Sequence, residues 1–211
     1  MDELQADPAT TAVMEAIRAR RSIRKYKPDP VDEGKLRLVI EAAILAPNAF
    51  NAQPWDFVVV TAPETRAKVA AVVMGGHRRL FGEARKDAVA GAELEERLMR
   101  FSGLAQAPAF IVPCLHRKRL PLKEGFDSHA AFWDVLSVGA AVENLIIAAT
   151  ALGLGTCWMG SLALREEALK ELLDIPAAAQ IAGVLALGQP DESPKPRPRD
   201  PFEQVVHYDR W

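Results

Sequence analysis

At its most informative point the chain reads Pro47-Asn48-Ala49-Phe50-Asn51-Ala52-Gln53-Pro54-Trp55. The stretch offers side-chain amides, a backbone restricted by proline and a flat indole. Upstream of it lies Arg20-Arg21-Ser22-Ile23-Arg24, which offers guanidinium groups and a hydroxyl. Guanidinium groups bind phosphate oxygens in a bidentate manner. Together the two motifs suit a ligand with an anionic end and a planar, hydrogen-bonding ring, and flavin mononucleotide (FMN) is such a ligand.

Each motif taken alone has a plainer interpretation. The arginines would suit an exposed helix C-terminus, where cations complement the helix dipole. Gln53-Pro54-Trp55 would suit a turn that ends in a core indole, and Arg197-Pro198-Arg199 a solvated linker. Gly153-Leu154-Gly155 would simply end a helix. The FMN hypothesis therefore depends on the motifs occurring together.

Length and charge narrow the class of protein. The 211 residues are 49% hydrophobic, which is enough for one well-buried domain and short for two. The net charge of -2 argues against a basic nucleic-acid-binding face. The acidic N-terminus lacks a signal-peptide core, and the longest apolar stretch, 138–154, contains Glu143 and Asn144 and is short for a membrane span. We therefore expect a soluble, cytoplasmic protein.

The cysteines and histidines give no sign of a metal site. Cys114 and Cys157 lie in apolar runs far apart in sequence, so we expect buried free thiols in a reducing compartment, with one disulfide as the alternative. The four histidines show no metal-ligand spacing, and no G-x-G-x-x-G follows a strand. His116-Arg117-Lys118-Arg119 is expected to form a solvated loop, with recognition of an NADPH phosphate as the alternative.

Helical and strand patterns alternate along the chain without a repeat. A first helix should begin at a cap formed by Thr10 or Thr11, and a second should begin after Asp32 and end before Pro47. Further helices are expected over 63–74, 92–101, 130–152 and 165–173. Strands are expected over 56–61, 109–114, 156–159 and 181–187. Gly75-Gly76 should break the third helix, with a mobile connection before the fourth.

The last residues, 190–211, should form an arm rather than part of the core. Their first half is too rich in proline to be helical. Their second half carries the apolar side chains Phe202, Val205, Val206, Tyr208 and Trp211. Such side chains need a surface to cover them, and a second subunit would provide it.

The chain resembles the nitroreductase family of FMN-dependent oxidoreductases, and the match covers nearly its whole length. Four segments carry the resemblance in the family's order: Arg20 to Arg24, the pattern A-P-x-x-x-N-x-Q-P-W ending at Trp55, Asn144 to Gly160, and Arg197 to Pro201. Two departures are that Asn48 and Ala49 stand where family members often have serine.

The resemblance implies a role for each site residue. Arg20, Arg197 and Arg199 would bind the FMN phosphate, with Arg21 beside them. Ser22 would bond near the ribityl or pyrimidine region, and Arg24 would reach the pyrimidine edge. Asn51 would be the amide contact to the flavin, Gln53 would fasten its loop, and Ser137 would lie over the ring, while Asn48 is a further cofactor-binding residue at a position where relatives often have serine. The turn Trp158-Met159-Gly160-Ser161 would lay backbone N–H groups against the flavin, with the Gly160 N–H at flavin N5.

The resemblance also implies the fold and the activity. The fold would be α+β, a mixed, mostly antiparallel sheet surrounded by helices, in one domain spanning 1–211. Two subunits would interlock as a homodimer and build the FMN sites at their interface, with the arm 190–211 extending onto the partner. The 130–152 helix, apolar around much of its circumference, is typical of a helix buried between subunits.

The activity implied is an NAD(P)H-dependent FMN oxidoreductase with ping-pong kinetics. NAD(P)H would pass hydride to flavin N5 and leave, and a nitroaromatic, a quinone or an activated alkene would then be reduced in its place. No protein group is expected to be a catalytic acid, because the flavin does the chemistry. The alternatives are a flavin-binding or flavin-storage protein without turnover, and a specialised member that fragments flavin or removes halogen from a tyrosine derivative.

Overall fold

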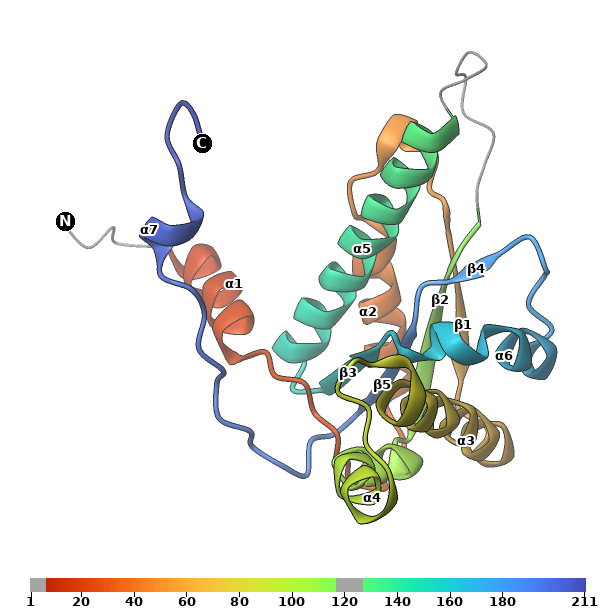
Figure 1. The fold of residues 1–211 in the computed structure, drawn as a ribbon. Helices are drawn as coiled ribbons and strands as arrows, with labels where there is room; N and C mark the ends of the chain where they lie inside the picture. The colour runs from red at the N-terminus through yellow and green to blue at the C-terminus, as the bar shows by residue number, and fades with distance from the viewer. Residues whose placement is uncertain (1–6, 117–126) are drawn as a thin grey trace.

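The computed structural model describes residues 7–116 and 127–211. Figure 1 shows a twisted sheet with helices on both faces and an extended C-terminal arm. The strands are β1 (Trp55–Val60), β2 (Ala109–Leu115), β3 (Gly155–Met159), β4 (Gln180–Ile181) and β5 (Val184–Gly188). Their order is β1-β2-β5-β3, β4 pairs with β2, and every one of these pairings is antiparallel. The expected α+β fold with a mostly antiparallel sheet is confirmed.

Seven α-helices occur in the described part of the chain: α1 (Pro8–Ala19), α2 (Glu33–Ile44), α3 (Pro63–Arg79), α4 (Gly91–Met99), α5 (Asp127–Ala151), α6 (Glu166–Leu173) and α7 (Phe202–Val205). Shorter turns are the 3-10 segments η1 (Ala49–Asn51), η3 (Ser102–Gln106) and η4 (Ser161–Arg165), and the π-helical η2 (Leu80–Ala84).

The sheet has a hydrophobic core on each face, because successive strand residues point to opposite sides. On β2, Phe110 and Val112 belong to the core under α3 and α6, whereas Ala109 and Ile111 belong to the core under α2 and α5. Both strand faces are therefore fully buried, which explains why β2 and β5 read as continuous apolar runs.

The helix α5 is the central element of the α2–α5 layer. Its stretch Ala130–Ala151 is long and apolar enough to cross a membrane by length and composition alone, with a mean hydropathy of 1.5. In the fold this helix packs on α2 and on the sheet through Val142 and Leu145. Near its start, Phe132 and Val135 stay 62% and 54% exposed, so an apolar strip of the helix is left uncovered by the chain itself.

The helix starts depend on aspartate caps. Asp32 accepts the Lys35 N–H at 2.9 Å, so the predicted cap of α2 is confirmed. The predicted cap of α1 was wrong, because Asp7 accepts the N–H groups of Ala9 and Thr10 at 2.9 and 3.0 Å. Pro8 occupies the first turn, where its missing N–H costs nothing.

The predicted break at Gly75-Gly76 was also wrong, because α3 continues to Arg79. Val69, Val73, Gly76 and His77 are buried at helical spacing, so one face of the helix keeps its packing partners through the two glycines. Glycine costs about 1 kcal/mol relative to alanine in a helix, which this packing offsets. Two glycines in sequence do not reveal that an apolar face continues beyond them.

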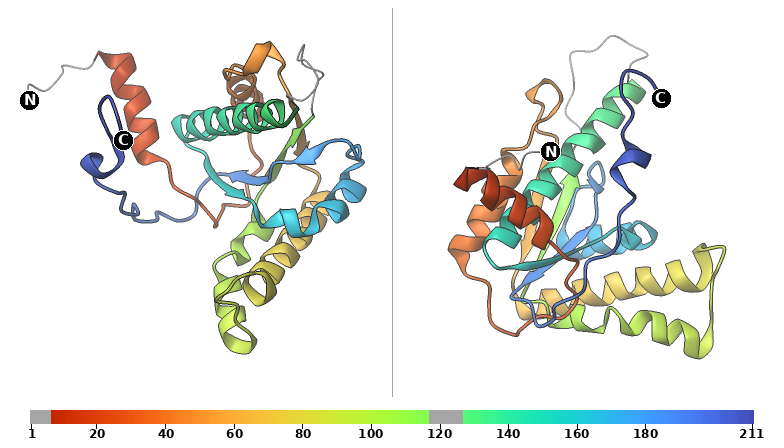
Figure 2. Two further views of the ribbon diagram at one scale, coloured as in Figure 1. Left: turned by 45° about the horizontal axis from the view of Figure 1, so that its top comes forward. Right: turned by 90° about the vertical axis from the view of Figure 1, so that its left-hand side faces the viewer.

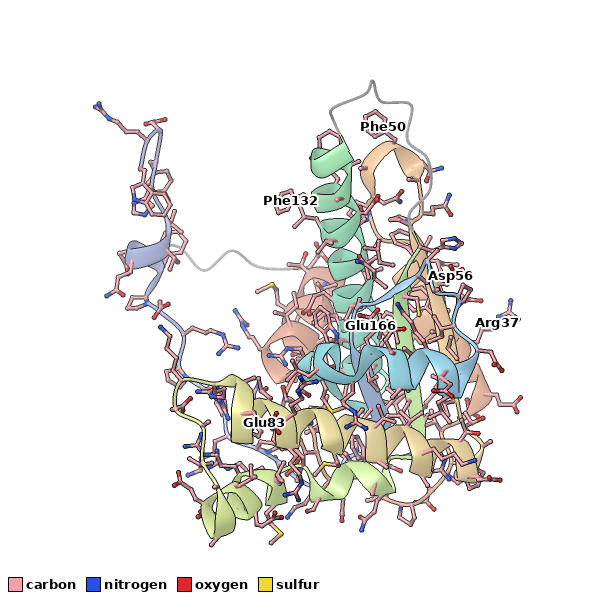
Figure 3. All side chains as sticks on the ribbon, turned by 45° about the vertical axis from the view of Figure 1, so that its right-hand side comes forward. Arg37, Phe50, Asp56, Glu83, Phe132 and Glu166 are labelled. Atoms are coloured by element: carbon pink, nitrogen blue, oxygen red, sulfur yellow. The ribbon has the colours of Figure 1, made fainter. Side chains whose placement is uncertain are left out.

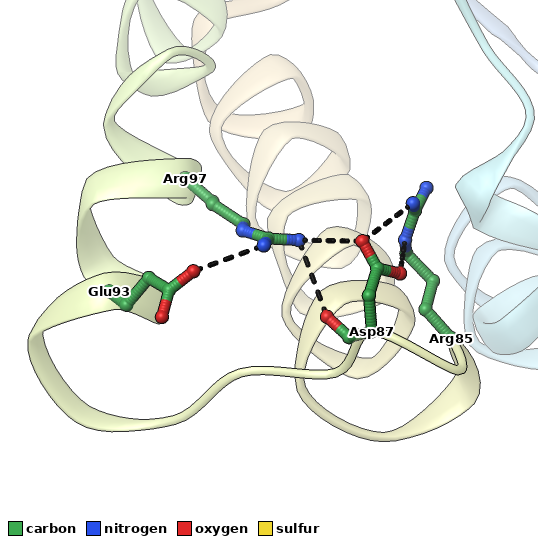
Figure 4. Close-up of polar contacts among 4 residues, drawn as sticks. All are labelled: Arg85, Asp87, Glu93 and Arg97. Carbon is green, nitrogen blue, oxygen red and sulfur yellow. Dashed lines mark hydrogen bonds and ion pairs between the residues drawn. The ribbon is translucent and has the colours of Figure 1, made fainter.

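The segment after α3 is a hairpin closed by ion pairs rather than a loose connection. Asp87 accepts two hydrogen bonds from Arg85, at 2.6 and 2.9 Å, and one from Arg97 at 3.4 Å, while Arg97 also pairs with Glu93 (Figure 4). The Arg85 guanidinium holds the pKa of Asp87 down at about 2. The turn 85–90 is thereby tied to the side of α4.

The predicted strand 181–187 is divided into β4 and β5. Gly183 adopts a φ of 133°, a conformation that other residues rarely take, and a side chain there would collide with the Trp158 indole. The Trp158 Nε1–H donates to the carbonyl of Ala182 at 3.1 Å. The two strands are thus separated by the contact that fixes Trp158.

Candidate functional site

The basic motif Arg20-Arg21-Ser22-Ile23-Arg24 lies against the start of β3. After α1 ends, Ser22 forms an isolated parallel bridge with Thr156, and the Ile23 N–H donates to the Thr156 carbonyl at 2.8 Å. Ile23 packs directly over Gly155, where any added side chain would come within 2.7 Å of it. The motif is therefore part of the sheet edge and not a free helix terminus.

The C-terminal arm returns to the same place. The Lys27 N–H donates to Gln189, and the Asp191 N–H donates to Lys25, both at 3.0 Å. The Glu192 carboxylate then accepts the N–H groups of Arg24 at 2.5 Å and Lys25 at 3.2 Å. This connection, which we call the Glu192 clamp, joins residues 168 positions apart in sequence. Beyond it the arm passes the basic motif and rises on the same side of the molecule as α1 (Figures 1 and 2).

The clamp brings all the predicted phosphate-binding arginines to one cavity of about 540 Å³, which we call the arginine hollow. Its lining residues are Ile17, Arg18, Arg20, Arg21, Ser22, Arg24, Pro194, Lys195, Pro196, Arg197 and Arg199. Among these described residues none is acidic. Because seven cationic side chains face one cavity, the arginine hollow can bind a multiply charged anion such as a phosphate.

The arginines of the hollow differ in how far the protein already uses them. Arg21 donates to the carbonyls of Arg18 and Arg20, both at 2.7 Å, and so caps the end of α1. Arg199 makes only long contacts, at 3.2 and 3.5 Å, with carbonyls of its own arm. Arg24 has a buried Nε with no partner among the described residues. Arg24 is thus the arginine of the hollow that has a buried donor left without a partner by the fold.

Arg24 connects the hollow to a small aromatic cluster. Its guanidinium carbon lies 5.2 Å from the centroid of the Phe101 ring, a cation–π distance. The Phe101 ring lies 3.9 Å from the ring of His77, and the Nδ1 of His77 lies 3.2 Å from the hydroxyl oxygen of Ser161. The predicted turn 158–161 is thereby linked to Arg24 through two side chains that the sequence did not single out.

Within that turn the four predicted residues face in different directions. The Met159 side chain is 3% exposed and belongs to the core, so only its backbone is available. Gly160 faces open space, since an added side chain would meet nothing within 4 Å. The Trp158 indole, 44% exposed, lines a separate apolar cavity of about 560 Å³ with Leu136 and Gly139 of α5.

The other predicted contacts lie elsewhere, in a loop that we call the amide loop (48–53). The Asn48 Oδ1 accepts the Gln53 N–H at 2.8 Å, and the Gln53 amide donates to Asn51 at 3.3 Å. The prediction that Gln53 fastens its loop is confirmed. The closed loop has positive φ at Phe50, Asn51 and Gln53, and of these residue types only asparagine tolerates this conformation better than most.

Ser137, on α5, contacts the amide loop and does not line the arginine hollow. Its hydroxyl donates to the Trp133 carbonyl at 2.7 Å and accepts the Ala49 N–H at 3.3 Å. Trp133 and Ser137 are in the first half of α5. In Figure 3 the labelled Phe50 and Phe132 lie towards this end of the molecule, and Glu83 lies at the opposite end. From Ser137 to Ala151, where α5 approaches β3, is about 21 Å along the helix axis. One chain therefore does not bring the two groups of site residues together.

Sequence reasoning missed three residues near the arginine hollow: His77, Phe101 and Glu192. His77 was considered only as a metal ligand, and Phe101 only as the end of a helix. Glu192 stands in a proline-rich stretch in which nothing marks it as a partner of Arg24. The only available signal was its place five residues before Arg197, where the last segment of the family resemblance begins.

The buried thiols carry no catalytic signature. Cys114 and Cys157 are free and buried, as expected. Burial raises the pKa of the Cys157 thiol and raises that of Cys114 to about 11, so both are protonated at neutral pH. Cys157 packs in the core beside the site and does not act as a nucleophile there.

The chain is similar to known proteins in sequence and in fold. The model of the nitroreductase family matches residues 17–189. A protein of Thermus thermophilus named NADH dehydrogenase is 34% identical over 94% of this chain and 98% of its own length. Among solved structures, an NADPH:FMN oxidoreductase from Vibrio harveyi complexed with NAD+ superposes with a TM-score of 0.73 at 24% identity, covering 95% of this chain and 78% of that one. A BluB-like flavoprotein from Clostridium difficile gives 0.76 at 22% identity, covering 94% and 99%.

Proposed function

Because the chain belongs to the nitroreductase family, we propose that it is an FMN-dependent NAD(P)H oxidoreductase that reduces nitroaromatics, quinones or activated alkenes by a ping-pong mechanism. The observation that carries the proposal is the arginine hollow, with Arg24 and its unused buried donor at one end. The cavity suits FMN in particular, because a flavin with a terminal phosphate needs both an anion site and a donor at the ring.

The residues present fit FMN when their chemistry is compared with that of the cofactor. The FMN phosphate carries close to two negative charges, which Arg20, Arg197 and Arg199 can bind through bidentate hydrogen bonds. Ser22 lies between Arg20 and Arg24 in sequence, on the segment that is bridged to β3. A dinucleotide flavin has no terminal phosphate monoester to offer, so the hollow favours FMN over FAD.

When bound, FMN supplies the hydride-accepting and hydride-donating chemistry. The chain's own residues bind, orient and tune it. Arg24 would place a positive charge beside the ring, where it would stabilise the negative charge of the reduced form and make reduction easier. Gly160 leaves its backbone open to close approach by a planar ring, because it has no side chain and no neighbour in front of it.

A homodimer explains why the amide loop lies so far from the arginine hollow. We propose that the Asn48, Asn51 and Ser137 groups of a second copy complete each site. Apolar side chains on α1 and on the arm support this, since Val13, Ile17 and Trp211 are 54%, 46% and 101% exposed. Such surface is usually covered by another protein. The arm 190–211 would extend onto that partner, and a reducing, cytoplasmic compartment fits the two free thiols.

The first experiment is a stopped-flow trace of the purified protein with bound flavin. The flavin absorbance should bleach when NADH or NADPH is added without oxygen, and it should return when a quinone or a nitroaromatic follows. A protein that binds FMN but never bleaches would be a storage protein and would contradict the proposal. Release of FAD rather than FMN on heating would contradict the cofactor assignment.

The specialised alternatives need a separate measurement. Neither flavin fragmentation nor removal of halogen from a tyrosine derivative is favoured by any described residue. A screen of acceptors against the NAD(P)H-reduced protein decides between them. Iodide release from an iodotyrosine, or dimethylbenzimidazole formed from reduced FMN and oxygen, faster than quinone reduction would replace the general reductase by the specialised one.

A further inference from the structure

His77 lies between the turn 158–161 and Phe101 and contacts both. It is 4% exposed on the inner face of α3. Its Nδ1 lies 3.0 Å from the carbonyl oxygen of Val73 and 3.2 Å from the hydroxyl oxygen of Ser161. Together these two contacts determine which nitrogen of His77 carries the proton and which way the Ser161 hydroxyl points.

A carbonyl oxygen can only accept a hydrogen bond, so the contact with Val73 requires the proton on Nδ1. The same N–H also faces Ser161, and a donor shared between two oxygens is a common three-centre arrangement. The Ser161 oxygen must therefore accept from His77, and the hydroxyl proton must point away from it. No acceptor for this proton lies among the residues that the structure describes.

The surroundings keep His77 neutral and fixed. Burial lowers the pKa of its imidazole, and the nearby Arg24 charge lowers it further. The ring is held against Phe101, at 3.9 Å between centroids, and Phe101 also supports the Arg24 guanidinium. Ser161 directly follows Gly160, whose backbone faces open space. The free hydroxyl proton is thus in the turn expected to meet the flavin ring.

We propose that the Ser161 hydroxyl donates a hydrogen bond to the flavin ring, and that His77 is the positioning residue that directs it there. The proposal rests on the proposed function, because it takes FMN as the ligand. It differs from the contacts implied by the family resemblance, which gave this turn only backbone N–H groups and gave His77 no part.

The first test measures FMN affinity by flavin fluorescence in Ser161→Ala, His77→Phe and the double variant. One neutral hydrogen bond corresponds to about a three- to tenfold weaker Kd in Ser161→Ala. Because His77 acts through Ser161, the double variant should bind FMN no more weakly than the weaker single variant. Ser161→Thr, which keeps the hydroxyl, should bind as the parent does. Riboflavin should lose affinity equally, since the contact is to the ring.

Two results would overturn the proposal. An unchanged Kd for FMN in Ser161→Ala would show that the Ser161 hydroxyl does not bind the flavin. Additive losses in the double variant, or a Ser161→Thr protein as weak as Ser161→Ala, would give His77 and Ser161 separate structural roles.

A second test does not depend on the flavin. Nitrogen-15 NMR of the histidine rings in the apoprotein should show His77 neutral with its proton on Nδ1, assigned by comparison with His77→Phe. A proton on Nε2 would reverse the direction of the hydrogen bond and overturn the proposal. If the parent binds no FMN at all, the proposed function fails, while this measurement still decides the proton arrangement.

Discussion

The arginines of the arginine hollow differ in whether their guanidinium groups already form short hydrogen bonds within the protein or remain available for a ligand. Arg21 is committed to the end of α1, whereas Arg199 has only long contacts within its own arm. A charge that the fold does not use can be removed with little effect on stability. Arg199 is therefore the best residue for testing the anion site.

Arg199→Ala should weaken FMN binding by about 1.5–3 kcal/mol, the range of a hydrogen bond to a charged group. Riboflavin lacks the phosphate, so it should bind the variant and the parent almost equally. Titration followed by flavin fluorescence measures both. Arg37→Ala is a matched control, because Arg37 is an exposed arginine on α2 that pairs with Glu41 and does not line the arginine hollow. If Arg199→Ala weakened riboflavin binding as much as FMN binding, Arg199 would have a structural role and would not bind the phosphate.

Arg24→Gln should make bound FMN harder to reduce. Removing one positive charge from the ring edge should lower the midpoint potential by roughly 20–60 mV, since about 30 mV corresponds to 1.4 kcal/mol in a two-electron couple. Arg24→Lys should keep much of the effect because it keeps the charge. A dye-equilibrated redox titration at saturating FMN measures the shift. An unchanged midpoint potential in Arg24→Gln would show that Arg24 does not lie beside the flavin ring.

Cys114 should make the protein less stable at alkaline pH. Burial raises the pKa of its thiol from 9.0 to about 11, so the folded state holds the proton longer than the unfolded state does. The stabilisation is fully present below pH 9 and is lost as the pH rises towards 11. Urea unfolding under reductant should show a flatter decline between these values in Cys114→Ala than in the parent. Parallel declines would show that the thiol does not contribute.

At the scale of the elements, glycine positions decide how closely the segments approach. Gly75 lies on α3 and Gly103 in η3, and the two positions differ in how much space a side chain would have. A side-chain carbon at Gly75 would have its nearest neighbour at 3.8 Å, on Arg165, whereas at Gly103 it would lie 2.3 Å from the Arg24 carbonyl oxygen. Gly103 therefore lets η3 lie against the backbone of Arg24.

Gly75→Ala should stabilise the protein by about 0.5–1 kcal/mol, because alanine favours a helix and meets no obstacle. Gly103→Ala should destabilise it and should also weaken FMN binding, because the backbone of Arg24 must move. Thermal unfolding and FMN titration of the two variants test this contrast. A destabilised Gly75→Ala would mean that α3 needs its glycine for a close contact.

The elements that the sequence predicted correctly are those with local signals. Asp32 before an apolar helical pattern and the apolar run 109–114 each specify their element without help from distant residues. The continuation of α3 through Gly75-Gly76 depends instead on packing of Val73 and His77 against remote segments. No local pattern carries that information.

The same distinction holds for the site. The resemblance brought Arg20, Arg24 and Arg199 to one ligand, and the structure places them around one cavity. It could not show that the amide loop lies at the other end of α5, because the predicted contacts were a set of residues without distances. The Glu192 clamp could not be predicted from the sequence either, because it joins residues 168 positions apart.

At the scale of the whole molecule, the arm has two separable parts. Its first part, with the Glu192 clamp and the two arginines, should serve the ligand. Its last part, with the exposed Phe202, Val205 and Trp211, should serve the partner. Two truncations can separate these functions.

A chain ending at Pro201 should form a weaker dimer, because it lacks the apolar end, and it should still bind FMN wherever it is dimeric, because it retains Arg199. A chain ending at Gly188 should lose both the dimer and FMN, together with much of its solubility. Gel filtration with detection at the flavin absorbance measures oligomeric state and cofactor at once. If the chain ending at Gly188 remained a yellow dimer, the arm would lie outside both the interface and the site.

The Glu192 clamp also has a consequence for the order in which the chain can fold during synthesis. Half of the arginine hollow follows α1, and the other half follows β5. Until the segment after β5 has been synthesised, the backbone of Arg24 lacks the carboxylate that holds it, and Arg197 and Arg199 are missing from the hollow. A polypeptide interrupted between β5 and Glu192 should therefore contain every strand of the sheet but leave the arginine hollow incomplete.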